Sequence, residues 1–228
     1  ECPDASEMLE MMANSGEHLS ELLDDLIDIA KVEAGTLEVE LSPCDIHELV
    51  HSSCELMRLR ASDSALRLEH TIDPSVPRGV CTDRIRYRQV LTNLLSNAIK
   101  FTDHGGIRVE VTYDQQEDRG FLTTRVIDTG PGITSEVVDL IFTPFVQLSK
   151  RADRRRSGIG LGLAIARQIA ELLGGDLALE STSPEGTTFR LTIQADCVDL
   201  EDPSQSCSGG TSDAVEQEQT AIDPDWSG

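Results

Sequence analysis

Apolar and polar positions between Asp83 and Thr102 alternate with the period of an α-helix. The apolar positions fall on one side, as expected of a face that packs into a core: Tyr87, Leu91, Leu94, Leu95 and Ala98. The opposite side gathers polar residues within about 80° of arc: Gln89, Asn93, Asn97 and Lys100. Asparagine is a poor helix former, but its carbonyl suits a hard cation and a nearby lysine suits phosphate. This helix alone is equally compatible with a binding face and with a solvated one.

A second helical pattern covers residues 5–34. Its seam repeats at spacings of alternately three and four: Leu9, Met12, Gly16, Leu19, Leu23, Leu26 and Ala30. Further apolar residues widen the face beyond that of a two-stranded coiled coil: Met8, Met11, Leu22, Ile27 and Ile29. The pattern therefore predicts one long bundle helix that needs partner helices.

The remaining patterns predict alternating helices and strands. We expect helices over 45–60, 135–141 and 162–173, and strands over 36–41, 66–72, 79–81, 107–113, 121–128, 176–181 and 187–194. Pro43 marks a turn, residues 73–77 form a loop, and residues 114–120 form a polar hairpin loop. Helices that cluster with an antiparallel sheet predict a two-layer α/β sandwich.

Charge is concentrated at the two ends of the chain, which has 228 residues and a formal charge of −22. Residues 1–34 carry ten acids against Lys31, and residues 196–228 carry nine acids and no Lys or Arg. This distribution argues against a nucleic-acid surface, which needs clustered Lys and Arg. The chain has no run of about 18 apolar residues and no signal-peptide pattern, so we expect a cytoplasmic piece without membrane contact, compatible with an anchor upstream.

The six cysteines show no C-x-x-C pair and no metal-ligand spacing, which predicts reduced thiols. From Asp196 onward the composition is rich in Ser, Gly, Pro and acids, and it predicts a disordered linker. A short docking peptide around Trp226 is the alternative interpretation of this tail.

Two glycine stretches lie downstream of the Asn93 helix. Val126 to Ile133 is an apolar run that ends in Asp128 and a Gly-Pro turn, and Gly158 to Ile165 leads directly into a helical pattern. Glycines before a helix let backbone N–H groups approach a phosphate. With Phe142 and Phe145 between them, these motifs occur in an order that closely resembles the N, G1, F and G2 boxes of the histidine kinase catalytic domain, in the GHKL superfamily.

The resemblance implies a GHKL-type fold and a site for ATP and Mg²⁺. It implies that Asn97 is the Mg²⁺ ligand, that Asn93 accompanies it, and that Lys100 contacts phosphate. It implies that Asp128 accepts a hydrogen bond from the adenine amino group. The remaining implied nucleotide contacts are Phe101, Gly130, Gly132, Ile133, Gly158, Gly160, Leu161, Gly162 and Thr187 or Thr188.

A lid over 144–157 is expected next to this site. It holds Lys150 and four arginines, which could draw in ATP or could form an ordinary basic loop. Phe142 and Phe145 are expected to pack rather than to touch a ligand.

The resemblance also gives a meaning to position 93. The ATPases of the superfamily carry a water-activating Glu at this position, whereas this chain carries Asn93. Asn93 favours transfer of the γ-phosphoryl group to histidine, for relay to a response-regulator aspartate. The alternatives are a GHKL-type ATPase and a non-catalytic nucleotide-binding interaction module. His18 lies on what resembles the second dimerisation helix, whereas the family's acceptor histidine lies on the preceding helix.

The resemblance also implies a domain order and partners. The expected parts are a second dimerisation helix (1–34), a linker (35–44), a catalytic ATP-binding domain (45–195) and an acidic disordered tail (196–228). The implied partners are the protein's own dimerisation domain, a homodimer partner and a response-regulator receiver domain.

Overall fold

The computed structural model describes residues 34–117, 119–146, 160–201 and 207, with positions 8, 12, 16, 23, 26–28, 30 and 31. One layer of the molecule is a five-stranded sheet in the order β2-β4-β5-β7-β6. Its strands are β2 (Arg67–Ile72), β4 (Gly106–Gln116), β5 (Arg119–Asp128), β6 (Asp176–Ser183) and β7 (Gly186–Gln194). Neighbours run antiparallel except β2 and β4, which run parallel.

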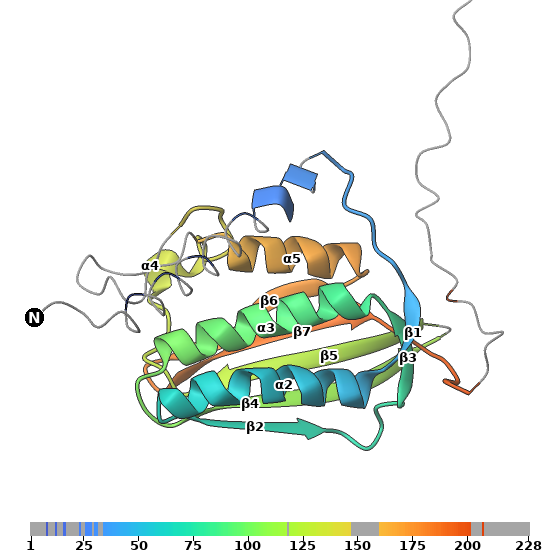
Figure 1. Ribbon diagram of the computed structural model, residues 1–228, viewed down its shortest axis with the longest axis horizontal. Coiled ribbons are helices and arrows are strands. Elements are labelled where there is room, and N and C mark those ends of the chain that lie inside the picture. The colour runs from blue at the N-terminus through green and yellow to red at the C-terminus, as the bar shows by residue number, and fades with distance from the viewer. Residues whose placement is uncertain are drawn as a thin grey trace, which may run out of the picture.

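Helices cover one face of this sheet and form the second layer (Figure 1). They are α2 (Ile46–Asp63), α3 (Arg84–Phe101) and α5 (Gly162–Leu172), and a single turn, α4 (Ser135–Val138), follows β5. The helix α3 lies between α2 and α5 and contacts both. Its apolar side faces the sheet, with Tyr87, Leu91 and Leu95 completely buried. The two-layer α/β fold is therefore confirmed.

A small sheet closes one end of the molecule, in the order β1-β3-β8. Its strands are β1 (Ser42–Asp45), β3 (Gly79–Thr82) and β8 (Asp196–Cys197). Both outer strands pair antiparallel with β3. The two segments β1 and β8, which lie before and after the asparagine and glycine motifs in the sequence, thus pair with opposite edges of one strand.

The helix α3 starts at a strong N-cap. One carboxylate oxygen of Asp83 accepts hydrogen bonds from the backbone N–H groups of Ile85, at 2.9 Å, and Arg86, at 3.0 Å. The other oxygen accepts from the N–H of Glu40 at 3.0 Å. Because Asp83 is buried, these bonds fix both the start of α3 and the path of the incoming chain.

Several boundaries differ from the sequence expectations. The predicted strand over 36–41 is wrong: β1 begins at Ser42, and the N–H of Glu40 is bonded to a side chain instead of a strand. Pro43 belongs to β1 rather than to a turn, which is tolerated because β1 is an edge strand. The parallel pairing of β2 with β4 also departs from the expected antiparallel sheet.

Other differences concern loops and chain ends. The β4–β5 hairpin is longer and its loop tighter than predicted, because the ladder continues to Gln116 paired with Arg119. The helix predicted over 135–141 ends at Val138. No strand was predicted after residue 194, yet Asp196 and Cys197 form β8.

Two further expectations concern cysteines and the first helix. Cys81 and Cys207 form a disulfide, so the prediction of reduced thiols is wrong for this pair. The predicted helix 5–34, with His18, lies largely outside the described residues, although its described positions include helical Ile27 and Asp28. In the described part of the chain, no helix is both long and apolar enough to cross a membrane.

Candidate functional site

Asn93 and Asn97 stand one turn apart on the polar side of α3. The amide nitrogen of Asn97 donates to the carbonyl oxygen of Asn93 at 3.0 Å. This bond uses the amide nitrogen of Asn97 and leaves its carbonyl oxygen as a candidate cation ligand.

The start of α5 lies directly against these asparagines. A Cβ atom at Gly162 would collide with the side-chain amide of Asn93. The preceding Leu161 is buried, and it anchors this end of α5 in the core. The two elements therefore approach this closely only because position 162 has no side chain.

Gly160 forms the other side of this junction. Its φ of +79° lies in the left-handed region, and an added Cβ would meet the backbone of Val146. Its carbonyl oxygen accepts a hydrogen bond from the N–H of Phe145 at 3.0 Å. The junction thus joins α5 to the segment before residue 147. Gly158 and most of the predicted lid, with its basic residues, lie outside the described residues.

Asp128 ends β5 as a buried carboxylate. It accepts a hydrogen bond from the backbone N–H of Gly130 at 2.8 Å and another from the backbone of Thr187, its register partner on β7. Burial raises the pKa of Asp128, and the two backbone hydrogen bonds act in the opposite direction. A buried acceptor held by the backbone can recognise an N–H donor of a ligand.

The turn after Asp128 packs against two other elements. Gly132 has a φ of +74°, and an added Cβ would collide with the carbonyl of Ser183. The N–H of Ile133 donates to the hydroxyl of Thr182 at 2.7 Å. An added Cβ at Gly130 would lie 3.0 Å from the carbonyl oxygen of Phe101. The turn therefore brings the end of β5 to the end of α3.

Lys100 and Phe101 lie at that end of α3. The Lys100 Nζ atom is 5.2 Å from the centroid of the Phe101 ring, and burial lowers the pKa of Lys100. Both side chains are half-buried.

Sequence reasoning missed Thr102, which caps the end of α3. Its hydroxyl is buried without a hydrogen-bond partner among the described residues, and it would lie 3.4 Å from a Cβ at Gly130. A buried, unpartnered hydroxyl beside a ligand turn is a candidate ligand contact. In the sequence, the only indication of a role for Thr102 in ligand binding is its position directly after Phe101.

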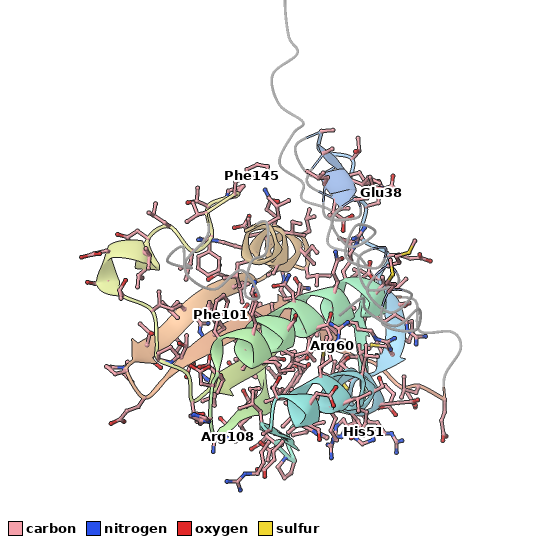
Figure 2. All side chains as sticks on the ribbon, turned by 60° about the vertical axis from the view of Figure 1, so that its left-hand side comes forward. Glu38, His51, Arg60, Phe101, Arg108 and Phe145 are labelled. Atoms are coloured by element: carbon pink, nitrogen blue, oxygen red, sulfur yellow. A yellow bond between two sulfur atoms is a disulfide. The ribbon has the colours of Figure 1, made fainter. Side chains whose placement is uncertain are left out.

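Phe142 and Phe145, which lie between the two glycine stretches, differ in how far they are buried. Phe142 packs edge-on against Phe189, with ring centroids 6.4 Å apart, and the Arg167 guanidinium lies 5.0 Å from its centroid. Phe145 has 63% of its surface exposed and a φ of +66°. Figure 2 shows it at the outer edge of the molecule, near α5. The expected packing is confirmed for Phe142 and is wrong for Phe145.

The fold and site define a nucleotide-binding domain in which a helix layer covers a mixed sheet. The sequence profile of the histidine kinase-, DNA gyrase B-, and HSP90-like ATPase family matches residues 82–196, just over half of the chain. The chain belongs to this family.

Curated relatives are larger sensor kinases. A sensor-like histidine kinase of Rhizobium meliloti is 35% identical over 190 residues, which cover 83% of this chain and 35% of the relative. The autoinducer 2 sensor kinase/phosphatase LuxQ of Vibrio harveyi is 34% identical over 189 residues, which cover 81% of this chain and 22% of LuxQ. The chain therefore spans about a third or less of the length of these relatives.

Solved structures give the same assignment. Full-length ShkA in complex with AMPPNP superposes with a TM-score of 0.72 at 29% identity, over 87% of this chain and 41% of ShkA. The histidine kinase AdeS of Acinetobacter baumannii gives a TM-score of 0.66 at 27% identity, over 85% of this chain and 86% of the AdeS chain. Both neighbours confirm the histidine-kinase type of ATPase fold.

Proposed function

We propose that this chain is the catalytic ATP-binding domain of a two-component sensor histidine kinase. It binds ATP and transfers the γ-phosphoryl group to a histidine on a dimerisation helix outside this sequence. The observation that carries the proposal is the junction at which Asn93, bonded to Asn97, meets Gly162, with Asp128 in the turn region at the end of α3. The complex of ShkA with AMPPNP, a nucleotide, supports the same use of the fold.

Adenine recognition is assigned to the Asp128 end of the site. An ionised carboxylate accepts from the exocyclic amino group of adenine, and the turn at Gly130 and Gly132 approaches the base closely. Ile133 supplies an apolar contact, and Thr187 and Thr102 supply hydroxyl groups near the base. This set combines one buried acceptor with an apolar surface, as small-molecule sites commonly do.

Phosphate binding is assigned to the junction of α3 with α5. Gly160, Leu161 and Gly162 offer backbone N–H groups where a helix begins, and Gly158 would extend this edge. Lys100 adds a positive charge at the end of α3, beside Phe101. These groups hold the phosphate chain between the adenine end and the acceptor.

Mg²⁺ fits the donor set on α3. The Asn97 amide nitrogen is used in its bond to Asn93, so its carbonyl oxygen is the ligand presented to a hard cation. When bound, Mg²⁺ neutralises charge on the phosphate oxygens. Asn93 acts as the residue that orients Asn97.

The reaction is a phosphoryl transfer to nitrogen. A bond forms between the γ-phosphorus and an imidazole nitrogen, while the bond to the β–γ bridging oxygen breaks and ADP leaves. Asn93 carries an amide, which cannot take a proton from water at neutral pH. Transfer to histidine is therefore favoured over the hydrolysis of a GHKL-type ATPase.

The domain assignment is part of the proposal. Residues 1–34 form the second dimerisation helix, 35–44 the linker, 45–195 the catalytic domain and 196–228 an acidic tail. The partners are a dimerisation domain, a second copy of the kinase and a response-regulator receiver domain. The piece acts in the cytoplasm.

A transfer assay in trans tests this function. The full 228-residue chain, given Mg²⁺-ATP and a separate dimerisation domain with the acceptor histidine, should label that histidine with an acid-labile, alkali-stable phosphate. Without the acceptor it should neither label itself nor turn over ATP quickly. Asn97→Ala should abolish both Mg²⁺-dependent ATP binding and transfer.

Two results would overturn the proposal. Rapid ATP turnover without an acceptor would favour the GHKL-type ATPase, and ATP binding without any transfer would favour a non-catalytic module. His18→Gln serves as the matched control, because transfer to the added acceptor should not change in this variant.

A further inference from the structure

A groove between α2 and α3 lies on the flank of α3 that faces away from α5. Its volume is about 430 Å³, within the range of small-ligand pockets. Met57 lies buried at its floor, while Leu56 and Ile85 are 64% and 69% exposed. Two large apolar side chains left in water beside a groove mark a surface that gains stability when covered.

Arginines surround this apolar floor. Arg84 and Arg88 contribute from α3 and Arg60 from α2, and Figure 2 shows Arg60 in the space between these helices. The Nε atom of Arg88 is buried without a hydrogen-bond partner among the described residues. An apolar floor with an arginine rim suits an aromatic residue flanked by carboxylates.

Residues 208–228 have this chemistry. They carry five acids, no Lys or Arg, and Trp226, which is the one tryptophan of the chain. An indole ring supplies a large apolar surface, and the neighbouring carboxylates of Asp223 and Asp225 can meet the arginine rim.

The chain reaches residue 208 from a point close to the groove. Val198 donates its N–H to the carbonyl of Gly79 at 3.0 Å, and Cys207 is bonded to Cys81. Cys81 precedes Arg84 by three residues. From Cys207 to Trp226 the chain can span about 60 Å when extended, so length does not limit contact with the groove.

We propose that the acidic segment 213–228 docks in the groove between α2 and α3 of its own chain, with Trp226 over the apolar floor and its carboxylates on the arginines. The inference is independent of the proposed kinase activity, because none of the residues that line the groove is assigned to the nucleotide site.

Tryptophan fluorescence of the full chain tests the proposal directly. Docking should give Trp226 a blue-shifted emission and protect it from acrylamide quenching. Raising the salt concentration to about 1 M shortens the screening length to about 3 Å, which should weaken both effects. Arg84→Glu should lower the ratio of docked to free tail by about fivefold, and Leu56→Glu should expose Trp226 in the same way.

Arg58→Glu is the matched control, because it makes the same charge change on α2 outside the groove, and it should leave the emission nearly unchanged. A fully quenchable, red-shifted Trp226 in the unaltered chain would overturn the proposal. A blue shift that survives both Arg84→Glu and Leu56→Glu would place the indole elsewhere. A blue shift that grows with protein concentration would show that a second copy supplies the tail, and would overturn docking within one chain.

Discussion

The contact between Gly162 and Asn93 shows how a single missing side chain shapes the site. It lets the start of α5 approach the asparagine pair more closely than any residue with a Cβ would allow. The Asn97–Asn93 hydrogen bond depends on the position of the same amide. One hydrogen atom in place of a methyl group therefore sets the distance between the proposed phosphate and metal ends of the site.

Gly162→Ala should weaken Mg²⁺-ATP binding by about 1–3 kcal/mol, because the added methyl group must displace Asn93 or α5. Isothermal titration calorimetry measures this change. Gly16→Ala is the control, since a Cβ there meets no atom of the described residues within 4 Å. Equal ATP affinities in the two variants would contradict the proposed site.

The pH dependence of ATP binding reports on Asp128. Protonation removes its acceptor, and burial raises its pKa. As the pH falls, affinity should therefore begin to drop at a higher pH than that at which an exposed aspartate protonates. At pH values above the raised pKa of Asp128, its buried ionised carboxylate lowers the free energy of unfolding. Lowering the pH through this pKa should therefore raise the free energy of unfolding.

Asp128→Asn supplies the comparison for the pH experiment. The amide does not titrate, so this variant should bind ATP more weakly and with a flatter pH profile. Binding measured by calorimetry at several pH values separates the two cases. An unaltered chain whose pH profile matches that of the variant would argue against Asp128 as the adenine acceptor.

At the scale of elements, the N-cap of α3 ties the incoming chain to the helix that carries the site. Asp83 accepts three backbone hydrogen bonds, one of them from Glu40. The N-cap of α2, Asp45, accepts one from Glu48 at 3.0 Å and pairs with exposed Arg78 at 2.7 Å. The two caps thus differ in burial and in the number of backbone groups that they satisfy.

Asp83→Ala should cost about 2 kcal/mol of the free energy of unfolding, and Asp45→Ala about 1 kcal/mol. The larger loss is expected because Asp83 is buried and serves two segments. Urea unfolding with an unchanged m-value measures both losses. A smaller loss for Asp83→Ala than for Asp45→Ala would mean that the contact with Glu40 contributes no stability.

The sequence correctly predicted those elements that are determined by residues close together in the chain. The two faces of α3, its Asp83 cap and the Gly stop after α5 could all be predicted from residues within a few positions of one another. The pairing of β1 and β8 with β3, and the parallel pairing of β2 with β4, depend on residues far apart in the chain. Asp196 and Cys197 carry no strand signal of their own, and the partner of Cys81 lies 126 residues away.

The site residues that belong to sequence motifs could be predicted, and those whose role depends on the folded surroundings could not. The sequence predicted Asn93, Asn97, Asp128 and the glycines as a set. Of these, Gly162 lies against Asn93, and the turn after Asp128 reaches the end of α3, while Gly158 lies outside the described residues. It missed Thr102, whose significance comes only from being buried without a partner. Phe145 was misjudged because its exposure depends on the fold around it and not on its own hydrophobicity.

At the scale of the whole molecule, the N-terminal seam leaves apolar surface uncovered. Met12, Leu23 and Leu26 are 69%, 57% and 47% exposed. Each large side chain gains roughly 1.5–3 kcal/mol when fully buried, so the chain should self-associate as a weak dimer. Sedimentation over a range of concentrations measures this association.

Leu23→Glu and Leu26→Glu should abolish the dimer. Leu59→Glu is the control, because Leu59 is 71% exposed on α2, away from the seam. A chain that stays monomeric at high concentration would show that the seam needs a different partner helix.

The small sheet has a mechanical consequence. Strands β1 and β8 both run antiparallel to β3, so they run parallel to each other. A pull on the chain before Ser42 and after Cys197 would load the ladders along the strand axis, in shear, before it reached the five-stranded sheet. Tension on the upstream segment would also reach the start of α3 through the hydrogen bond between the Glu40 N–H and Asp83, whereas the turn after β5 lies outside the loaded strands.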